Sequence, residues 1–198
     1  MNSVSIHRPY RLKARAERQL ETRGRIVAAT EELHREVGPA RTTIADIARR
    51  AGVERLTVYN HFPELTQLLG ACQARFLSGH PPPDVAPGKV SRGMAPARLE
   101  QALADLYGWF RENEPMQRHV QRDRLVMPEL DELLRRNADP RFDRAAAAYA
   151  ALLTRSPRKA ASIQRLVRLA FDFRTWELVA AGGSDAEAAS TMRDAIAR

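Results

Sequence analysis

The residues best suited to recognition chemistry lie close together, between positions 55 and 61. Arg55 can donate two parallel hydrogen bonds, which matches the two acceptors on the exposed edge of guanine. The hydroxyls of Thr57 and Tyr59 suit phosphate oxygens, and the Tyr59 ring can also lie against a sugar or a thymine methyl. The Asn60 amide can pair with adenine or hold a phosphate, and His61 adds a polar group at the end of the stretch. These groups favour contact with DNA over catalysis of a reaction.

Two further positions extend this set. Leu56 is suited to an apolar contact with a thymine methyl group. Thr43 lies earlier, at the expected start of another helix, where its hydroxyl and the helix N-terminus can both face a phosphate. The alternative interpretation is that all of these side chains are the solvated surface of an ordinary helical turn.

The stretch 42–62 predicts two short helices that would position these residues. Thr43 can cap the first helix, with Asp46 at the acidic position of a capping box. Gly52 can end it in a left-handed conformation. Val58 and Phe62, four residues apart, would hold the second helix against a core. An apolar stripe at helical spacing faces inward from the first helix: Ile44, Ile47, Ala48 and Ala51. This pattern is a helix-turn-helix whose second helix has the right size for a DNA major groove.

The order of residues, T-T-I-x-x-I-A-x-x-A-G-V-x-x-x-T-V-Y-x-H-F, closely resembles the DNA-binding signature of the TetR (tetracycline repressor) family of bacterial transcription regulators. The resemblance covers roughly residues 23–70. It implies an all-α protein with an N-terminal three-helix head and a larger helical body for ligand binding and dimerisation. It also implies a homodimer joined through its C-terminal helices, double-stranded palindromic operator DNA as a partner, and a small-molecule effector.

Two positions depart from the family pattern. Leu65 stands where relatives often have a lysine that grips a phosphate. Glu54 replaces a serine often found at the start of the recognition helix. A glutamate there suits the positive end of the helix dipole, but its charge repels a close phosphate. One backbone contact is therefore in doubt, and the basic N-terminus is expected to compensate.

The net charge of +8 is concentrated at the N-terminus. Residues 1–25 contain seven Lys and Arg against two acids. Basic tails are often only solvated segments, but beside a helix-turn-helix such a segment indicates phosphate binding. We expect a flexible basic arm over residues 1–18, followed by a helix from about Gln19 to Val37.

The remaining chain predicts helices separated by proline and glycine. We expect a DNA-binding domain over residues 19–63 and a body over residues 64–198. The body would begin with a helix over 64–78, followed by an irregular, poorly ordered loop over 79–97. Further helices are expected over 96–113, 115–126, 128–137, 139–153, 156–181 and 185–197.

Large apolar side chains of the body are either plain core or the lining of a ligand pocket. The resemblance implies such a pocket, and the candidates are Trp109, Phe110, Met127, Phe173 and Trp176. Arg118, Arg122 and Arg168 could neutralise an anionic ligand, although arginines on helix faces usually point to water. The long segment 156–181 is apolar on more than one side, which favours burial against a second subunit. Burial within one body is the alternative.

Composition argues against several classes of protein. No apolar run approaches the roughly 18 residues of a membrane span, and the N-terminus has no signal-like segment, so a cytoplasmic location is expected. The single cysteine, Cys72, permits no internal disulfide, and it suits the core better than a redox sensor. Histidine spacing argues against a metal site. No catalytic constellation and no cofactor site stand out, so we do not expect an enzyme.

The interpretation that follows is a homodimeric transcriptional regulator of TetR type, acting as a repressor that a small ligand releases from a palindromic operator. Two alternatives remain. One is a helical protein that binds small molecules and has an incidental basic head. The other is a nucleoid-type protein that binds DNA without regard to sequence.

Overall fold

The structure is a computed structural model that describes residues 7–197, with side chains described from Lys13 onward. The described residues form helices and connecting segments without a β-strand, which confirms the predicted all-α class. The chain divides into two compact units, one ending at Gly79 and the other beginning at His80. Along the described chain, no helix has the length and apolar character needed to cross a membrane.

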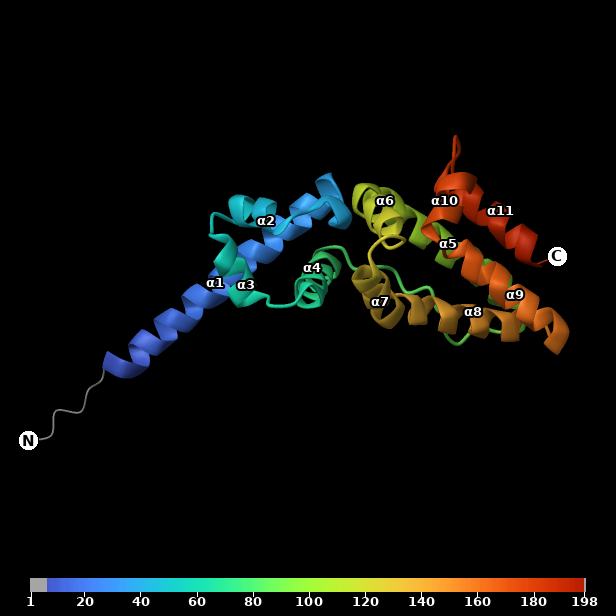
Figure 1. The fold of residues 1–198 in the computed structure, drawn as a ribbon. Helices are drawn as coiled ribbons and strands as arrows, with labels where there is room; N and C mark the ends of the chain where they lie inside the picture. The colour runs from blue at the N-terminus through green and yellow to red at the C-terminus, as the bar shows by residue number, and fades with distance from the viewer. Residues whose placement is uncertain (1–6, 198) are drawn as a thin grey trace, which may run out of the picture. The chain divides into compact units, whose positions relative to one another are not determined.

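The first unit, called the head here, is built on one long helix (Figure 1). Its elements are α1 (His7–Glu36), η1 (Pro39–Arg41), α2 (Ile44–Ala51), α3 (Arg55–His61) and α4 (Leu65–Gly79). A single apolar core joins them. It comprises Ile26, Val27, Ala29 and Leu33 of α1, Ile47, Ala48 and Ala51 of α2, and Val58, Phe62 and Leu68. The predicted helix-turn-helix is therefore confirmed, and α1 is the surface on which it is assembled.

The ends of α2 have the predicted caps. The Thr43 hydroxyl accepts a hydrogen bond from the Asp46 amide at 3.1 Å, which satisfies one free N–H of the first turn. Gly52 follows α2 with φ 65° and ψ 43°, and its amide bonds back to the Ala48 and Arg49 carbonyls. This left-handed residue turns the chain so that the Val53 amide also reaches the Ala48 carbonyl, at 3.0 Å, before α3 begins.

The predicted start of the first helix at Gln19 was wrong, because α1 begins at His7. Residues 7–18 of the expected flexible arm are helical, whereas residues 1–6 lie outside the described part of the chain. Pro9 falls in the first turn of α1, where a helix needs no amide donor. The residues after it are mostly Arg, Lys, Leu, Ala and Glu, which have high helix propensity.

The expected boundary between residues 63 and 64 also differs from the structure, because α4 belongs to the head. Leu68, Cys72 and Phe76 of α4 are buried. The Cys72 sulfur lies 3.5 Å from His34 Nδ1 of α1, and Arg75 forms an ion pair with Glu31 at 3.0 Å. Apolar burial and these contacts join α4 to α1, so residues 64–79 are part of the head.

The second unit, the body, contains η2 and seven α-helices among its described residues. They are η2 (Arg92–Met94), α5 (Ala95–Glu112), α6 (Glu114–Asp123), α7 (Pro128–Asn137), α8 (Asp139–Leu153), α9 (Pro157–Ala170), α10 (Phe173–Val179) and α11 (Asp185–Ala197). Leu99, Leu103, Leu106 and Tyr107 of α5 form the centre of its core. The helices α8, α9, α10 and α11 surround that centre (Figure 1). Residues of α5, α8, α9, α10 and α11 form one core, and α5 contributes more of them than any other helix of the body.

The expected single helix over 156–181 was wrong, because it is broken between Ala170 and Phe173. Asp172 adopts an extended conformation, with φ −85° and ψ 135°, and its carboxylate accepts a hydrogen bond from the Arg174 amide at 2.9 Å. That N-cap starts a new helix, and aspartate favours caps over helix interiors. The capping box predicted at Ser184 and Glu187 is confirmed by reciprocal bonds of 2.9 and 3.2 Å.

The segment 80–91 lacks helix as predicted, but it is tied to the body rather than loose. Val85 is 3% exposed and belongs to the body core. Arg98 Nη2 donates to the carbonyls of Asp84 and Ala86, both at 2.9 Å. Trp109 Nε1 donates to the His80 carbonyl at 3.1 Å. Side chains of α5 therefore hold this irregular segment in place.

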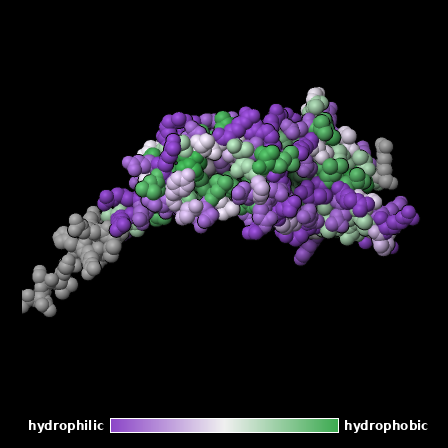
Figure 2. Space-filling model, in the orientation of Figure 1, coloured by the Kyte–Doolittle hydropathy of each residue, from purple (hydrophilic) through white to green (hydrophobic). Residues whose placement is uncertain are grey.

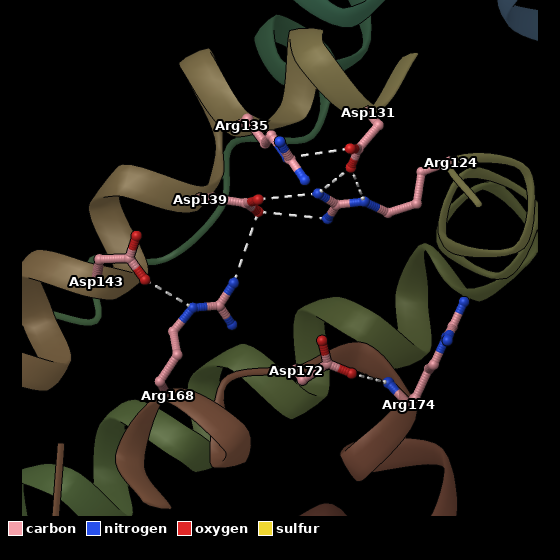
Figure 3. A network of polar contacts seen from close by, with 8 residues as sticks. All are labelled: Arg124, Asp131, Arg135, Asp139, Asp143, Arg168, Asp172 and Arg174. Carbon is pink, nitrogen blue, oxygen red and sulfur yellow. Dashed lines mark hydrogen bonds and ion pairs between the residues drawn. The ribbon is translucent and has the colours of Figure 1, made fainter. Parts of the chain in front are cut away.

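An ion-pair network fixes the first turn of α8 (Figure 3). Asp139, the first residue of α8, accepts hydrogen bonds from Arg124 at 2.9 Å and pairs with Arg168 at 3.6 Å. Arg124 also bonds to Asp131 of α7, and Arg168 bonds to Asp143 one turn further along α8. Hydrophilic side chains accordingly gather over α7 and the start of α8 on the visible face in Figure 2. The network links α7, α8 and α9.

Gly52→Ala should destabilise the head, because an alanine strains at positive φ by about 1–2 kcal/mol. Space is not the reason, since an added Cβ would meet only Arg25 Nη1 at 3.8 Å. Gly24→Ala is the matched control: it lies inside α1 with nothing within 4 Å of an added Cβ, and it should stabilise by about 0.5–1 kcal/mol. Urea unfolding followed by circular dichroism measures both. Equal effects of the same sign would contradict this account of the turn.

Cys72 should behave as a core thiol and not as a sensor. Burial, reinforced by the negative charge of Glu31, raises the pKa of its thiol to about 12, so almost no thiolate forms at pH 8. A colorimetric disulfide reagent at pH 8 should leave the native chain unmodified and react with one equivalent of thiol after denaturation in guanidinium chloride. Rapid modification of the native chain would contradict a buried position.

Candidate nucleic-acid interface

Helix α3 separates a buried side from an exposed one. Val58 is fully buried and Phe62 is 3% exposed, and both pack into the head core. On the other side Leu56 is 65% and Tyr59 52% exposed, and Arg55 and Asn60 are exposed as well. Large apolar and aromatic side chains that remain exposed on a folded head suggest an interaction surface.

Thr57 and His61 are half-buried, so they lie at the margin of the exposed side of α3. Two grooves of the head surface meet there. The first is lined by Ala14, Arg15, Arg18, Gln19, Thr22, Thr57 and His61, and the second by Ala16, Gln19, Leu20, Arg23, Thr57, Asn60 and His61. The grooves place arginines of α1 beside the polar residues of α3.

Thr43 is exposed at the start of α2, but its hydroxyl has local partners. It donates to the Asp46 carboxylate at 2.6 Å and accepts from the Asp46 amide. Hydrogen bonds from Thr43 and the charge of Arg49 lower the pKa of the Asp46 carboxyl. The N-terminus of α2 therefore carries a negative charge. A phosphate would have to displace the Thr43–Asp46 bond to use this hydroxyl.

Both departures from the family pattern are visible in the structure. Glu54 is the N-cap of α3, with an extended backbone and no side-chain hydrogen bond to the helix. Leu65 is the first residue of α4 and is 42% exposed. Because it is a leucine, this exposed position offers no cation to a phosphate.

Arg23 holds α3 in place, a role that the sequence pattern does not reveal. Its guanidinium donates to the carbonyl of His61 at 2.8 Å and lies over the Phe62 ring, 3.9 Å from the ring centre. Arg25 similarly donates to the Ala51 carbonyl at 3.2 Å. These two arginines of α1 therefore bind the last carbonyls of α3 and α2, which favour cations. In the sequence both stand out only as part of the basic charge.

Four of the five predicted ligand-pocket residues lie together in the body. Phe110, Phe173 and Trp176 are nearly completely buried, and their ring centres lie 5.2–5.9 Å apart. Trp109 is half-buried and packs on Phe110. Met127 is the N-cap residue of α7 and is not part of this aromatic cluster or the buried core. The structure therefore brings four of the candidates together and leaves Met127 apart, because α7 does not contribute to that core.

The arginines considered for an anionic ligand already have carboxylate partners. Arg118 pairs with Glu114 and Glu177, and Arg122 pairs with Asp123. Arg168 pairs with Asp139 and Asp143 (Figure 3). Arg118 thereby links α6 to α10 and Arg168 links α9 to α8, whereas the Arg122 pair lies within α6.

The apolar residues of the 156–181 segment are divided between the body core and its surface. Val167, Ala170, Phe171, Phe173 and Trp176 are buried within this one chain. Leu166, Leu169 and Leu178 remain 39%, 53% and 79% exposed. Burial within one body thus accounts for much of the apolar run, and a few exposed leucines remain.

Geometry and surface chemistry together define a helix-turn-helix head of the DNA-binding type joined to a helical body. Residues 26–72 match the family model described as "Bacterial regulatory proteins, tetR family". This segment runs from the core-forming part of α1 through α2 and α3 into α4. The N-terminal domain of the chain therefore belongs to the TetR family of bacterial regulatory proteins.

Similar proteins of known name carry the likeness in the same region. The chain is 47% identical over 51 residues to the HTH-type transcriptional regulator TtgR of Pseudomonas putida, a match that covers 26% of this chain and 24% of that protein. It is 42% identical over 57 residues to the HTH-type transcriptional regulator CymR of Pseudomonas putida, covering 29% of this chain and 28% of that protein. The chain thus spans about a quarter of the length of these relatives.

The fold agrees over a greater length. A tetR-family transcriptional regulator from Streptomyces coelicolor, solved as a crystal structure, superposes with a TM-score of 0.59 and 20% identity, covering 89% of this chain and 78% of that one. At this identity the match establishes the fold alone. The body therefore has the helical architecture of such regulators, and its ligand is not implied by the match.

Arg23→Lys should weaken the head although the charge is kept. Lysine reproduces neither the planar contact with Phe62 nor the directed bond to the His61 carbonyl, and we expect a loss of about 1–2 kcal/mol. Arg18→Lys is the control, because its Nε bonds only to the Ala14 carbonyl of its own helix and is exposed. Urea unfolding should separate the two variants. Identical stabilities would mean that the Arg23 contact does not hold α3.

Proposed function

We propose that this protein is a homodimeric repressor that reads a palindromic operator and leaves it when a small molecule binds its body. The observation that carries the proposal is the exposed side of α3, with Tyr59, Leu56 and Arg55 outward and Val58 buried, in a head that matches the tetR family. Such a helix fits a major groove, and two of them in a dimer would read half-sites about one helical turn apart.

The side chains of α3 have different roles in this proposal. Arg55 and Asn60 are exposed and have the donors that read guanine and adenine edges, and Leu56 contacts a thymine methyl. Tyr59, with half its surface exposed, donates its hydroxyl to a phosphate. Thr57, His61 and Thr43 lie at the margins and contact the backbone of the DNA.

The exposed cations of α1 provide attraction that does not depend on sequence. Between residues 13 and 25, α1 has five Lys or Arg residues and two glutamates. Arg23 and Arg25 hold the head together, so Lys13, Arg15 and Arg18 are the ones available to phosphates. The grooves beside Thr57 and His61 continue this surface toward α3. Neutralised phosphates release counterions, so binding should weaken steeply with salt.

Dimerisation and ligand release are assigned to the body. The exposed Leu166, Leu169 and Leu178 of the C-terminal helices supply apolar surface for a partner subunit. A ligand acts if it binds one dimer shape more tightly than the other, and a coupling of about 1–3 kcal/mol is enough.

Sequence-indifferent binding is the second candidate, and the positive charge of α1 favours it. It requires only the cations of α1, whereas operator reading requires the exposed side of α3 as well. A steep salt dependence with equal affinity for unrelated duplexes would support this candidate.

Selection of bound sequences from a random duplex library at physiological salt tests the proposal. We expect a palindrome with half-sites about one helical turn apart. Sedimentation of the free protein at micromolar concentration should give twice the chain mass. Recovery of unrelated sequences would overturn operator reading, and a monomer on DNA would overturn the dimer.

On the recovered site, Tyr59→Phe and Thr57→Ala should each weaken binding roughly three- to tenfold, since each removes one hydrogen bond to phosphate. Titration of labelled DNA measures the affinity, and thermal unfolding provides the control. Full affinity for both variants would remove these residues from the interface. A parallel fall in unfolding temperature would assign them to the core instead.

A further inference from the structure

A cavity of about 440 Å³ lies in the body between the irregular segment 82–86 and α8. It is separate from the aromatic cluster around Phe110 and from the head. Its walls are Pro82, Pro83, Asp84, Val85, Ala86, Arg141, Arg144, Ala145 and Ala148. Most of these side chains are small and apolar, and the charged ones come mainly from α8.

Arg141 is the unusual residue of this cavity. Its Nε is buried and has no hydrogen-bond partner among the described residues. Within the described chain, no carboxylate lies at ion-pairing distance from its guanidinium, which instead lies over the Phe142 ring at 4.4 Å. Burial lowers the pKa of this guanidinium, although an arginine stays charged at neutral pH. The side chain is half-buried and the charge of Asp84 acts favourably on it, but its buried Nε is left unsatisfied. A buried donor without an acceptor costs stability, so it requires an explanation.

Other arginines around α8 differ from Arg141 in this respect. Arg124 and Arg168 are paired with Asp139 and Asp143 (Figure 3). At 3.6 residues per turn, those two aspartates lie on one side of α8, and Arg141, Arg144 and Ala148 lie on nearly the opposite side. The network thus fixes the start of α8 without occupying the cations that face the cavity.

The opposite wall of the cavity is already in place. Arg98 Nη2 donates to the carbonyls of Asp84 and Ala86, and the Ala86 amide donates to Asp84 Oδ1 at 3.0 Å. Tyr149 of α8 donates its hydroxyl to the Arg98 carbonyl at 3.2 Å. A ligand would therefore enter a largely formed site and would not have to order the segment.

We propose that this cavity binds a small organic anion, with its carboxylate on Arg141 and Arg144 and its apolar part against Val85, Ala145 and Ala148. Asp84 also lines the cavity; its charge acts favourably on Arg141 and opposes an anion. Its carboxylate is exposed, as Arg144 is, and bonds to its own turn. Two guanidinium groups against one carboxylate leave a net positive site. The guanidinium fork matches a carboxylate with two parallel hydrogen bonds.

Binding at this site does not depend on DNA. Its use as the effector site rests on the proposed function. In that role, the segment 80–91 that forms one wall is relevant because it follows α4 of the head directly in the chain. A binding measurement without DNA therefore fails or succeeds separately from operator reading.

Equilibrium dialysis of the full chain against 2-naphthoate tests the site, with neutral 2-naphthamide as the matched probe. We expect saturable binding of one 2-naphthoate per chain and at least about tenfold weaker binding of the amide, because the charged hydrogen bonds are lost. Arg141→Met should weaken 2-naphthoate binding by at least about tenfold. Arg158→Met, an exposed arginine of α9 outside the cavity, should bind like the unchanged protein.

Thermal unfolding separates a binding role from a structural one. Arg141→Met removes the unsatisfied buried Nε and keeps an aliphatic side chain, so its unfolding temperature should stay equal or rise. Ala148→Phe provides a second test, because it fills the cavity without removing a charge and should also abolish binding. Absence of saturable 2-naphthoate binding, equal binding by Arg141→Met, or a lowered unfolding temperature of Arg141→Met with binding intact would each overturn the proposal.

Discussion

Burial of one face of α1 is the interaction on which the rest of the head depends. Ile26, Val27, Ala29 and Leu33 form the surface on which α2, α3 and α4 are packed. An isolated helix of seven residues such as α3 is not stable in water, so it exists only because Val58 and Phe62 are buried on that surface. Arg23 adds a directed contact at the end of α3. The outward side of α3 does not pack against the core of the head. Its exposed residues are therefore available for recognition: Arg55, Leu56, Tyr59 and Asn60.

Helix α1 also carries the positive charge that would attract DNA. Its cations are of two kinds in the structure: Arg23 and Arg25 are bound to carbonyls of α3 and α2, and Lys13, Arg15 and Arg18 are exposed. Affinity and specificity would therefore arise from different elements, the first from the exposed part of α1 and the second from α3. This division explains how a head without a lysine at position 65 can still be attracted to phosphates.

The sequence predicted caps and turns from local patterns, but it missed two helix boundaries and the contacts that depend on distant neighbours. Caps at Thr43 and Ser184 and the left-handed Gly52 follow from residue type and spacing. The start of α1 was missed because the basic N-terminus was expected to be a flexible arm, although its residues favour helix and a first turn tolerates Pro9. The break at Asp172 was missed because apolar periodicity hid a single capping residue. The partner of Arg23 lies 38 residues away, and the unsatisfied Nε of Arg141 depends on the packing of another segment. No spacing rule reveals them.

We propose that α3 reads bases while α1 only attracts phosphates. Sequence selection from a random duplex library, repeated in parallel with Arg55→Ala and Arg18→Ala, tests this most directly. We predict that Arg55→Ala loses the preference at one base pair of each half-site. We predict that Arg18→Ala recovers the unchanged sequence with lower affinity and a shallower salt dependence. An unchanged preference in Arg55→Ala, or a changed sequence in Arg18→Ala, would contradict the account.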